Sequence, residues 1–142
     1  MKLFISLILA FAFCQVGWAV ETALTVVALS ETASAVAANS VDTSNGNRSY
    51  NPNCDVAFLL TNTDVSNSAT VTFTAVSTSV NLPAYGAMAK ANNAVTLTAG
   101  QSKFIGPFPC AGWNNSTGYV VYATTGTGAA SVKISPFRVP KR

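Results

Sequence analysis

Beyond its first 19 residues the chain is built from short runs in which apolar and polar residues alternate. The clearest run covers residues 69–76 (ATVTFTAV), where Val71, Phe73 and Ala75 fall on one face and threonines on the other. A period of two is the pattern of a half-buried β-strand. Strands are also predicted at residues 22–29, 92–97, 103–105, 118–124 and 130–139, and at residues 55–62, which are apolar enough to lie centrally in a sheet.

Turn-forming residues separate these runs. Residues 42–53 (DTSNGNRSYNPN) predict turns throughout, because Asn-Gly and Asn-Pro are strong turn formers, and residues 62–68 predict a hairpin loop. Residues 31–38 fit a short helix or a loop or strand, and the interrupting Thr, Ser and Val favour loop or strand. Residues 83–91 predict a long loop, where contact residues tend to concentrate.

Short strands with regularly spaced turns are typical of a β-sandwich or a small barrel. We therefore predict an all-β fold for residues 20–142: a single antiparallel β-sandwich, jelly-roll or Ig-like, of about seven or eight strands. Pro136 interrupts the last run, so that strand is expected to lie at a sheet edge or to be broken there.

The first 19 residues predict a secretory signal peptide that forms a helix. Met1 and Lys2 give a short basic start, residues 3–13 are almost wholly apolar, and Gly17 and Ala19 supply small residues at the positions that a signal peptidase needs. The alternative is a retained membrane anchor, since residues 3–20 come close to the roughly 20 apolar residues that a spanning helix needs. We expect cleavage after Ala19 and an exported domain.

Cleavage would remove Cys14 and leave one pair of cysteines, Cys54 and Cys110. Because disulfides persist outside the cytosol, this pair predicts one bridge, worth about 4 kcal/mol by the chain-entropy model. The alternative is two separate buried thiols. A metal site is not expected, because two cysteines in a chain with no histidine make an incomplete zinc site.

A corner of fixed shape is predicted immediately before Cys110. Gly106, Pro107 and Pro109 occur in the sequence Gly-Pro-Phe-Pro. Each proline limits its own φ and has no backbone N–H to donate, so this stretch does not need to pair with a neighbouring strand. The bridge would tie the corner to the start of the strand at residue 55, and we interpret the stretch as a source of rigidity.

Charge and residue types argue against several functions. Only 9% of residues are charged, and residues 20–142 carry seven basic and five acidic side chains, a net +2. The basic residues are scattered, whereas a nucleic-acid binder clusters them. Without histidine the common general base is missing, and no phosphate-binding loop or carboxylate motif is present. We expect no enzyme, no cofactor and no nucleic-acid partner, and a low-charge surface that suits packing between copies.

The aromatic residues suggest one alternative. Trp113 and Tyr85, with Tyr119 and Tyr122, could stack on sugar rings, which would make the protein a secreted carbohydrate-binding module with a polysaccharide partner. Tyr119 and Tyr122 would, however, lie on opposite faces of one strand. A tryptophan near a disulfide also fits a core or lid position.

The second half of the chain resembles a group of small β-sandwich virion proteins of phages, of the head-decoration or minor structural type. The resemblance rests on Asn45-Gly46-Asn47, the strand at residues 56–62 and above all LTAGQSKFIGPF at residues 97–108, followed by Trp113-Asn114, GYVVY at residues 118–122 and residues 132–139. It implies a β-sandwich with a non-enzymatic structural role. No catalytic or ligand residues carry over from it.

The signal peptide and the cysteine pair are departures from the usual member of that group. They point to an exported relative that coats a filament, a cell surface or a virion assembled at a membrane. The leading hypothesis is therefore a structural subunit of a virion or extracellular assembly. Its expected partners are copies of itself or a major coat or surface protein, with membrane contact through the N-terminal segment.

Overall fold

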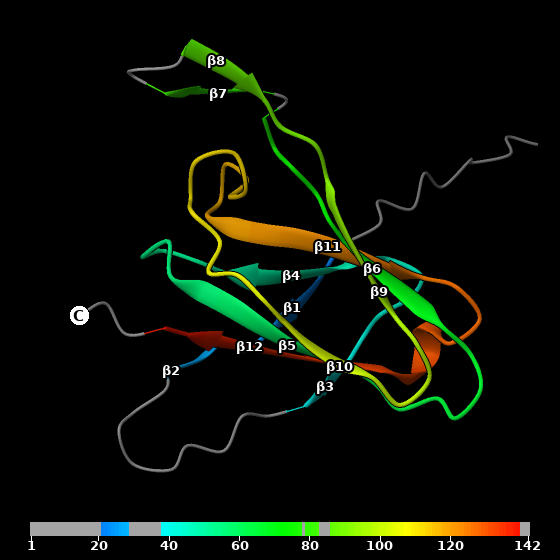
Figure 1. Ribbon diagram of the computed structural model, residues 1–142. Helices are drawn as coiled ribbons and strands as arrows, with labels where there is room; N and C mark the ends of the chain where they lie inside the picture. The colour runs from blue at the N-terminus through cyan, green and yellow to red at the C-terminus, as the bar shows by residue number, and fades with distance from the viewer. Residues whose placement is uncertain (1–20, 29–37, 78, 83–85, 140–142) are drawn as a thin grey trace, which may run out of the picture.

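The computed structural model describes residues 21–28, 38–77, 79–82 and 86–139. The predicted signal peptide, residues 1–19, and Tyr85 lie outside this part. The prediction of an all-β sandwich is confirmed: two sheets pack face to face, and the one helical element described is a single 3-10 turn, η1 (Ala129–Ser131) (Figure 1). No helix in the described ranges is long and apolar enough to cross a membrane.

Each sheet has its own strand order. The first sheet runs β1 (Thr22–Leu24), β4 (Asn47–Tyr50), β11 (Tyr119–Thr125), β6 (Ala69–Phe73) and β9 (Asn93–Leu97). The second runs β10 (Ser102–Ile105), β5 (Val56–Asn62), β12 (Val132–Arg138) and β2 (Val27–Ala28), and β3 (Asn39–Ser40) also pairs with β12. Pairing is antiparallel except at β1–β4 and β12–β2, which are parallel.

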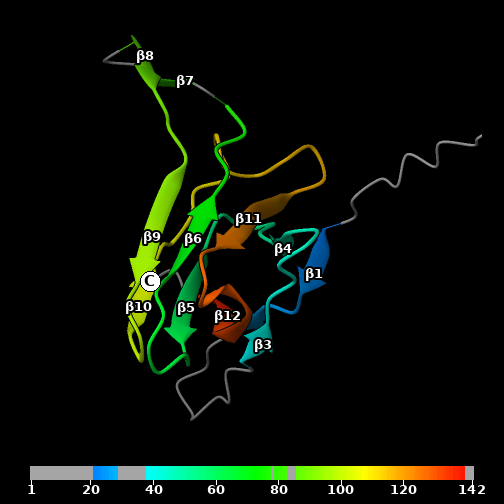
Figure 2. The same cartoon turned by 90° about the vertical axis from the view of Figure 1, so that its right-hand side faces the viewer.

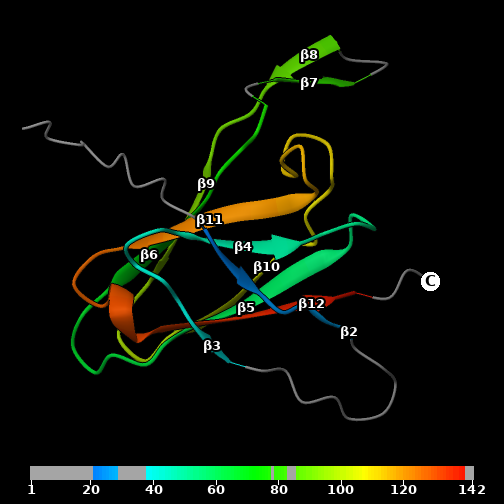
Figure 3. The same ribbon diagram turned by 180° about the vertical axis from the view of Figure 1, so that it is seen from behind.

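The two sides of the sandwich are closed by different segments. On one side the chain passes from β9 in the first sheet to β10 in the second (Figure 2). On the other side it passes from β1 to β2 (Figure 3). Leu24 and Val26 from this second crossing pack against the core. The β9–β10 side therefore presents the free edge of one strand from each sheet.

The core lies between the sheets and is dominated by aromatic rings. Phe58 contacts Phe73, Phe108 and Tyr122 with ring centroids 5.0–5.5 Å apart. Burial of the Tyr122 hydroxyl raises its pKa, and its hydrogen bond with Ser49 Oγ at 2.8 Å partly offsets that effect. The aliphatic members of the core come from both sheets: Val56, Leu60, Ala69, Val71, Leu97, Val120, Val132 and Ile134.

Two predictions about irregular segments are wrong. β4 lies inside residues 42–53, where we predicted only turns, because its inward-facing residues are Asn47 and Ser49 and it has no apolar alternation. β8 (Gly86–Ala89) lies inside the predicted long loop and pairs with β7 (Ser79–Leu82). This hairpin projects beyond the sandwich (Figure 1), and its Gly-Ala-Met-Ala sequence gives no β-branched signal.

Pro136 neither breaks β12 nor places it at an edge. Val139 N–H donates to Asp55 O, so by alternation along the ladder the backbone nitrogen of Pro136 faces away from β5. On that other side β3 pairs only with residues 133 and 134, and β2 only with residues 137 and 138. The missing N–H falls between these two short partners, which makes proline compatible with an inner strand here.

Candidate functional site

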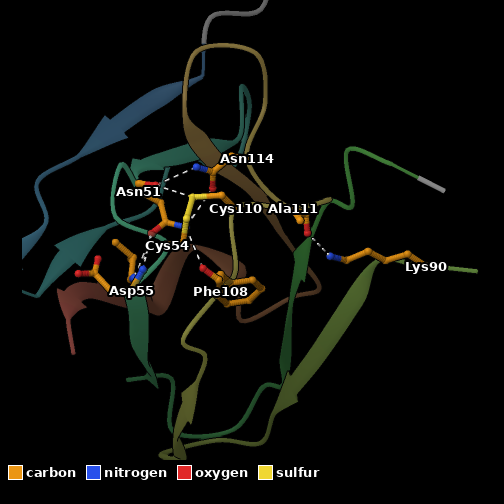
Figure 4. The surroundings of a disulfide bond; sticks show 9 residues. Asn51, Cys54, Asp55, Lys90, Phe108, Cys110, Ala111 and Asn114 are labelled. Atoms are coloured by element: carbon orange, nitrogen blue, oxygen red, sulfur yellow. Dashed lines mark hydrogen bonds between the residues drawn. A yellow bond between two sulfur atoms is a disulfide. The ribbon is translucent and has the colours of Figure 1, made fainter. Parts of the chain in front are cut away.

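The predicted bridge between Cys54 and Cys110 is confirmed. It joins residues 56 positions apart, with Cα atoms at 4.8 Å, and ties the chain just before β5 to the loop that follows β10 (Figure 4). Cys54 has a φ of 58°, a left-handed conformation that few residues other than glycine adopt. A structural disulfide is typical of proteins outside the reducing cytosol.

Asn51 organises the backbone around this bridge. Its side chain is fully buried, and its Oδ1 accepts hydrogen bonds from the N–H groups of Asp55 and Val56 at 3.0 and 3.1 Å. Its Nδ2 donates to Phe108 O at 2.9 Å (Figure 4). The one amide therefore holds the start of β5 against the corner that carries Cys110.

A second asparagine extends this network. Asn51 Nδ2 also donates to Asn114 Oδ1 at 2.9 Å, and Asn114 Nδ2 donates to Asn51 O at 2.8 Å. Neither role was predicted from the sequence, where Asn51-Pro52 indicates only a turn and Asn114 carries no signal of its own. An asparagine three residues before a bridging cysteine was the available clue, since asparagine side chains replace backbone partners in turns.

The corner at Gly106, Pro107 and Pro109 adopts a compact shape. The Gly106–Pro107 peptide bond is cis, both prolines are exposed, and the buried Phe108 returns to β5 by donating its N–H to Val56 O at 2.8 Å. Gly106 has a φ of 108°, and a Cβ placed there would lie 2.9 Å from Ala57 Cα. Only glycine lets the chain pass this close to β5.

The substitution Gly106→Ala should therefore destabilise the fold by about 2–4 kcal/mol. Gly100→Ala is the comparison: its φ of 70° lies in the left-handed region that other residues can adopt at modest cost, and nothing lies within 4 Å of the added Cβ. We expect this variant to lose about 1 kcal/mol. Urea unfolding of the two variants measures the difference, and equal losses would contradict the close approach of Gly106 to β5.

The proposed aromatic contacts, Trp113 and Tyr85, are not brought together in the described part of the chain, since Tyr85 lies outside it. Trp113 is half-buried and packs edge-on against Phe108 at 4.9 Å. Lys90 places Nζ 4.3 Å from the Trp113 ring centroid and donates to Ala111 O at 2.9 Å, and partial burial lowers the pKa of Lys90. Trp113 thus covers the end of the core.

A different aromatic pair lies on the outer face of the first sheet. Tyr50, 47% exposed, lies opposite Tyr119 with ring centroids 5.1 Å apart. The Arg48 guanidinium stacks on the Tyr119 ring at 4.8 Å and contacts Glu21 at 3.9 Å. Tyr119 and Tyr122 lie on opposite faces of β11, as predicted, because Tyr122 points into the core. The Tyr50 and Tyr119 rings could stack on a flat ligand, with the Arg48 cation beside them.

β10 is an open edge with a large apolar side chain at its centre. Phe104 is 73% exposed and makes an edge-on contact with Phe137 at 5.8 Å. Within the described residues no strand pairs with β10 on the side away from β5. Natural proteins usually protect such edges, because unpaired N–H and C=O groups bind other strands.

The neighbouring edge, β9, is partly blocked. Lys103 extends from β10 across the gap between the sheets and donates from Nζ to Thr96 O at 2.8 Å. The Thr96 carbonyl is therefore already bonded within the chain, which makes it less available to an added strand. The structure therefore leaves β10, and not β9, as the edge suited to docking.

Two carboxylates in turns are held ionised by hydrogen bonds. Asn45 and Ser44, with the Thr22 hydroxyl, lower the pKa of Asp42, and backbone N–H groups of Ser66 and Asn67 lower that of Asp64. A low pKa makes a poor general base near neutral pH. Within the described ranges no three His, Cys, Asp or Glu residues are grouped to hold a metal ion.

The fold and the bridge define the class of protein as a disulfide-stapled β-sandwich. Comparisons of the chain with protein-family models, with curated proteins and with solved structures find no match. The resemblance to phage virion proteins therefore stays a prediction from the residues that carry it, and any function is argued from the surface described above.

Proposed function

We propose that the protein is a non-enzymatic structural subunit of a virion or extracellular assembly, and that it acts by associating with copies of itself. The observation that carries this proposal is the open β10 edge with Phe104 exposed at its centre. An open edge beside a large exposed apolar side chain favours association with another strand. The low content of charged residues adds little repulsion between copies.

The stapled corner supports the same proposal. A subunit that is held in place by its edges must present them in a fixed position. Here the bridge, Asn51 and the Gly106 corner all act on β5, the strand to which β10 is paired. Export is the setting that the bridge and the N-terminal apolar pattern favour.

Removing the exposed apolar group at the edge tests the proposal. We expect Phe104→Ser to weaken self-association at least tenfold, because the lost side chain buries apolar surface on assembly. Val76→Ser is the matched control, since Val76 is 49% exposed and follows β6 in the first sheet, where its N–H donates to Gly112 O. Light scattering after size exclusion, over a range of concentrations, measures the association. A protein that stays monomeric at every concentration would overturn the proposal.

A carbohydrate-binding module is the second candidate, and the Tyr50–Tyr119 pair with Arg48 is the observation that favours it. Exposed rings can stack on sugar faces while an adjacent cation and hydroxyls bind polar groups. Affinity electrophoresis through a polysaccharide gel tests this candidate, and a monomer that is retarded by the polysaccharide would support it. Tyr50, at 47% exposure, is the residue whose replacement should then abolish the retardation.

A further inference from the structure

We infer that two copies of the chain pair their β10 strands antiparallel about a two-fold axis that passes beside Lys103. The second sheet of one copy would then continue into the second sheet of the other. This inference rests on the proposed self-association and specifies its partner, a second copy, and the register of the contact. It makes a symmetric dimer the unit from which a larger assembly is built.

The hydrogen bonds between β5 and β10 decide which backbone groups are free. Asn62 N–H donates to Gln101 O at 2.9 Å, so these two residues form a narrow, hydrogen-bonded pair. Such pairs alternate along an antiparallel ladder, and residues 103 and 105 therefore also face β5. Ser102 and Phe104 direct their N–H and C=O groups to the open edge. Only these two residues of β10 can bond to an added strand.

The need to pair these two residues selects the register. With the axis beside Lys103, Ser102 of each copy lies opposite Phe104 of the other, and each pair exchanges both of its hydrogen bonds. With the axis beside Phe104, only the two Phe104 residues pair within the strand. Ser102 then lies opposite Gly106, where β10 has already ended. The first register makes twice as many bonds between strand residues.

The side chains are compatible with this register. Two Lys103 residues would face each other at the axis, where like charges repel. Each Nζ, however, already reaches Thr96 O of its own copy at 2.8 Å, which draws the charge away from the axis. The two Phe104 rings lie diagonally across the pair on the outer face, a separation that aromatic side chains can bridge. They would extend the Phe104–Phe137 contact.

The backbone can be tested without removing Phe104. The N–H of Ser102 points away from β5, so Ser102→Pro should leave that ladder intact while it removes a donor from each copy at the interface. We expect this variant to fold, as judged by circular dichroism, and to associate roughly ten- to a hundredfold more weakly. Unchanged association in a folded variant would overturn the inference.

Cross-linking tests the register independently of whether the proline variant folds. Residues opposite each other in a wide, non-hydrogen-bonded pair have Cα atoms close enough for a disulfide. We therefore expect Lys103→Cys to give a covalent dimer on a non-reducing gel, and Val76→Cys, at an exposed site beyond β6 in the first sheet, to give none above the parent protein. No covalent dimer from Lys103→Cys would overturn the register.

The Ser102→Pro and Lys103→Cys variants, compared with the parent protein, distinguish a failure of this inference from a failure of the proposed function. If the parent protein assembles but neither variant behaves as expected, the assembly uses another surface and only the inference fails. If the parent protein does not assemble at any concentration, the proposed function itself fails. A cross-linked Lys103→Cys dimer together with weaker association of Ser102→Pro supports both.

Discussion

Replacing both cysteines with serine should lower the free energy of unfolding by about 2–5 kcal/mol, the usual loss for a native bridge in a small domain. The bridge spans 56 positions, and the chain-entropy model assigns about 4 kcal/mol to a loop of that size. The loss has a local component as well. Without the bond, Cys54 loses a restraint that holds its backbone at a φ of 58°.

Urea unfolding followed by tryptophan fluorescence measures this loss, because Trp113 packs close to the bridge on Phe108. The parent protein treated with a reductant is the matched control and should unfold at the same urea concentration as the Cys54→Ser, Cys110→Ser double variant. If the double variant were as stable as the untreated parent, the Cys54–Cys110 bridge would not stabilise the fold, which would contradict this prediction.

Asn51→Ala is expected to cost about 3–5 kcal/mol, which is large for an uncharged polar side chain. The truncation removes the acceptor of the Asp55 and Val56 N–H groups and the donor to Phe108 O, all beside a fully buried site. Buried groups that lose their partners carry a desolvation cost that a surface residue would not.

Two variants sharpen this prediction. Asn93→Ala removes the same side chain at an exposed position of β9 and should change stability by no more than about 0.5 kcal/mol. Asn51→Asp keeps an acceptor for Asp55 and Val56 but loses the donor to Phe108 O, so it should also destabilise. Equal stability of Asn51→Ala and Asn93→Ala in thermal unfolding would contradict the role of Asn51 as the organiser of the corner.

The sandwich and the bridge were predictable because their signals are local or nearly unique. The alternation in residues 69–76 contains β6, and Cys110 was the one available partner for Cys54 once the first segment was set aside. β4 escaped prediction because its inward positions are polar, and the partners that satisfy them, Asp42 and Tyr122, are known only from the fold. Hydrophobic pattern cannot report a strand that buries amides and hydroxyls.

The candidate site was less predictable for a related reason. Trp113 and Tyr85 were chosen as contact residues by their type alone, and an aromatic ring can bind a ligand only if it faces solvent. Trp113 instead packs on the core, with Lys90 over its ring. The exposed edge depends on sheet order, which places β10 at the end of the second sheet although its sequence resembles any other short strand. Exposure of Phe104 follows from that order and not from its neighbours in sequence.

Backbone hydrogen exchange of the unmodified protein, compared between dilute and concentrated solutions, shows whether copies of the chain associate through β10. Assembly through β10 predicts that the amides of Ser102 and Phe104 become protected as concentration rises, while the outer edge of β9, already blocked by Lys103, exchanges at an unchanged rate. Assembly that leaves the β10 amides exchanging as fast as in the dilute protein, or no assembly at all, would contradict the account.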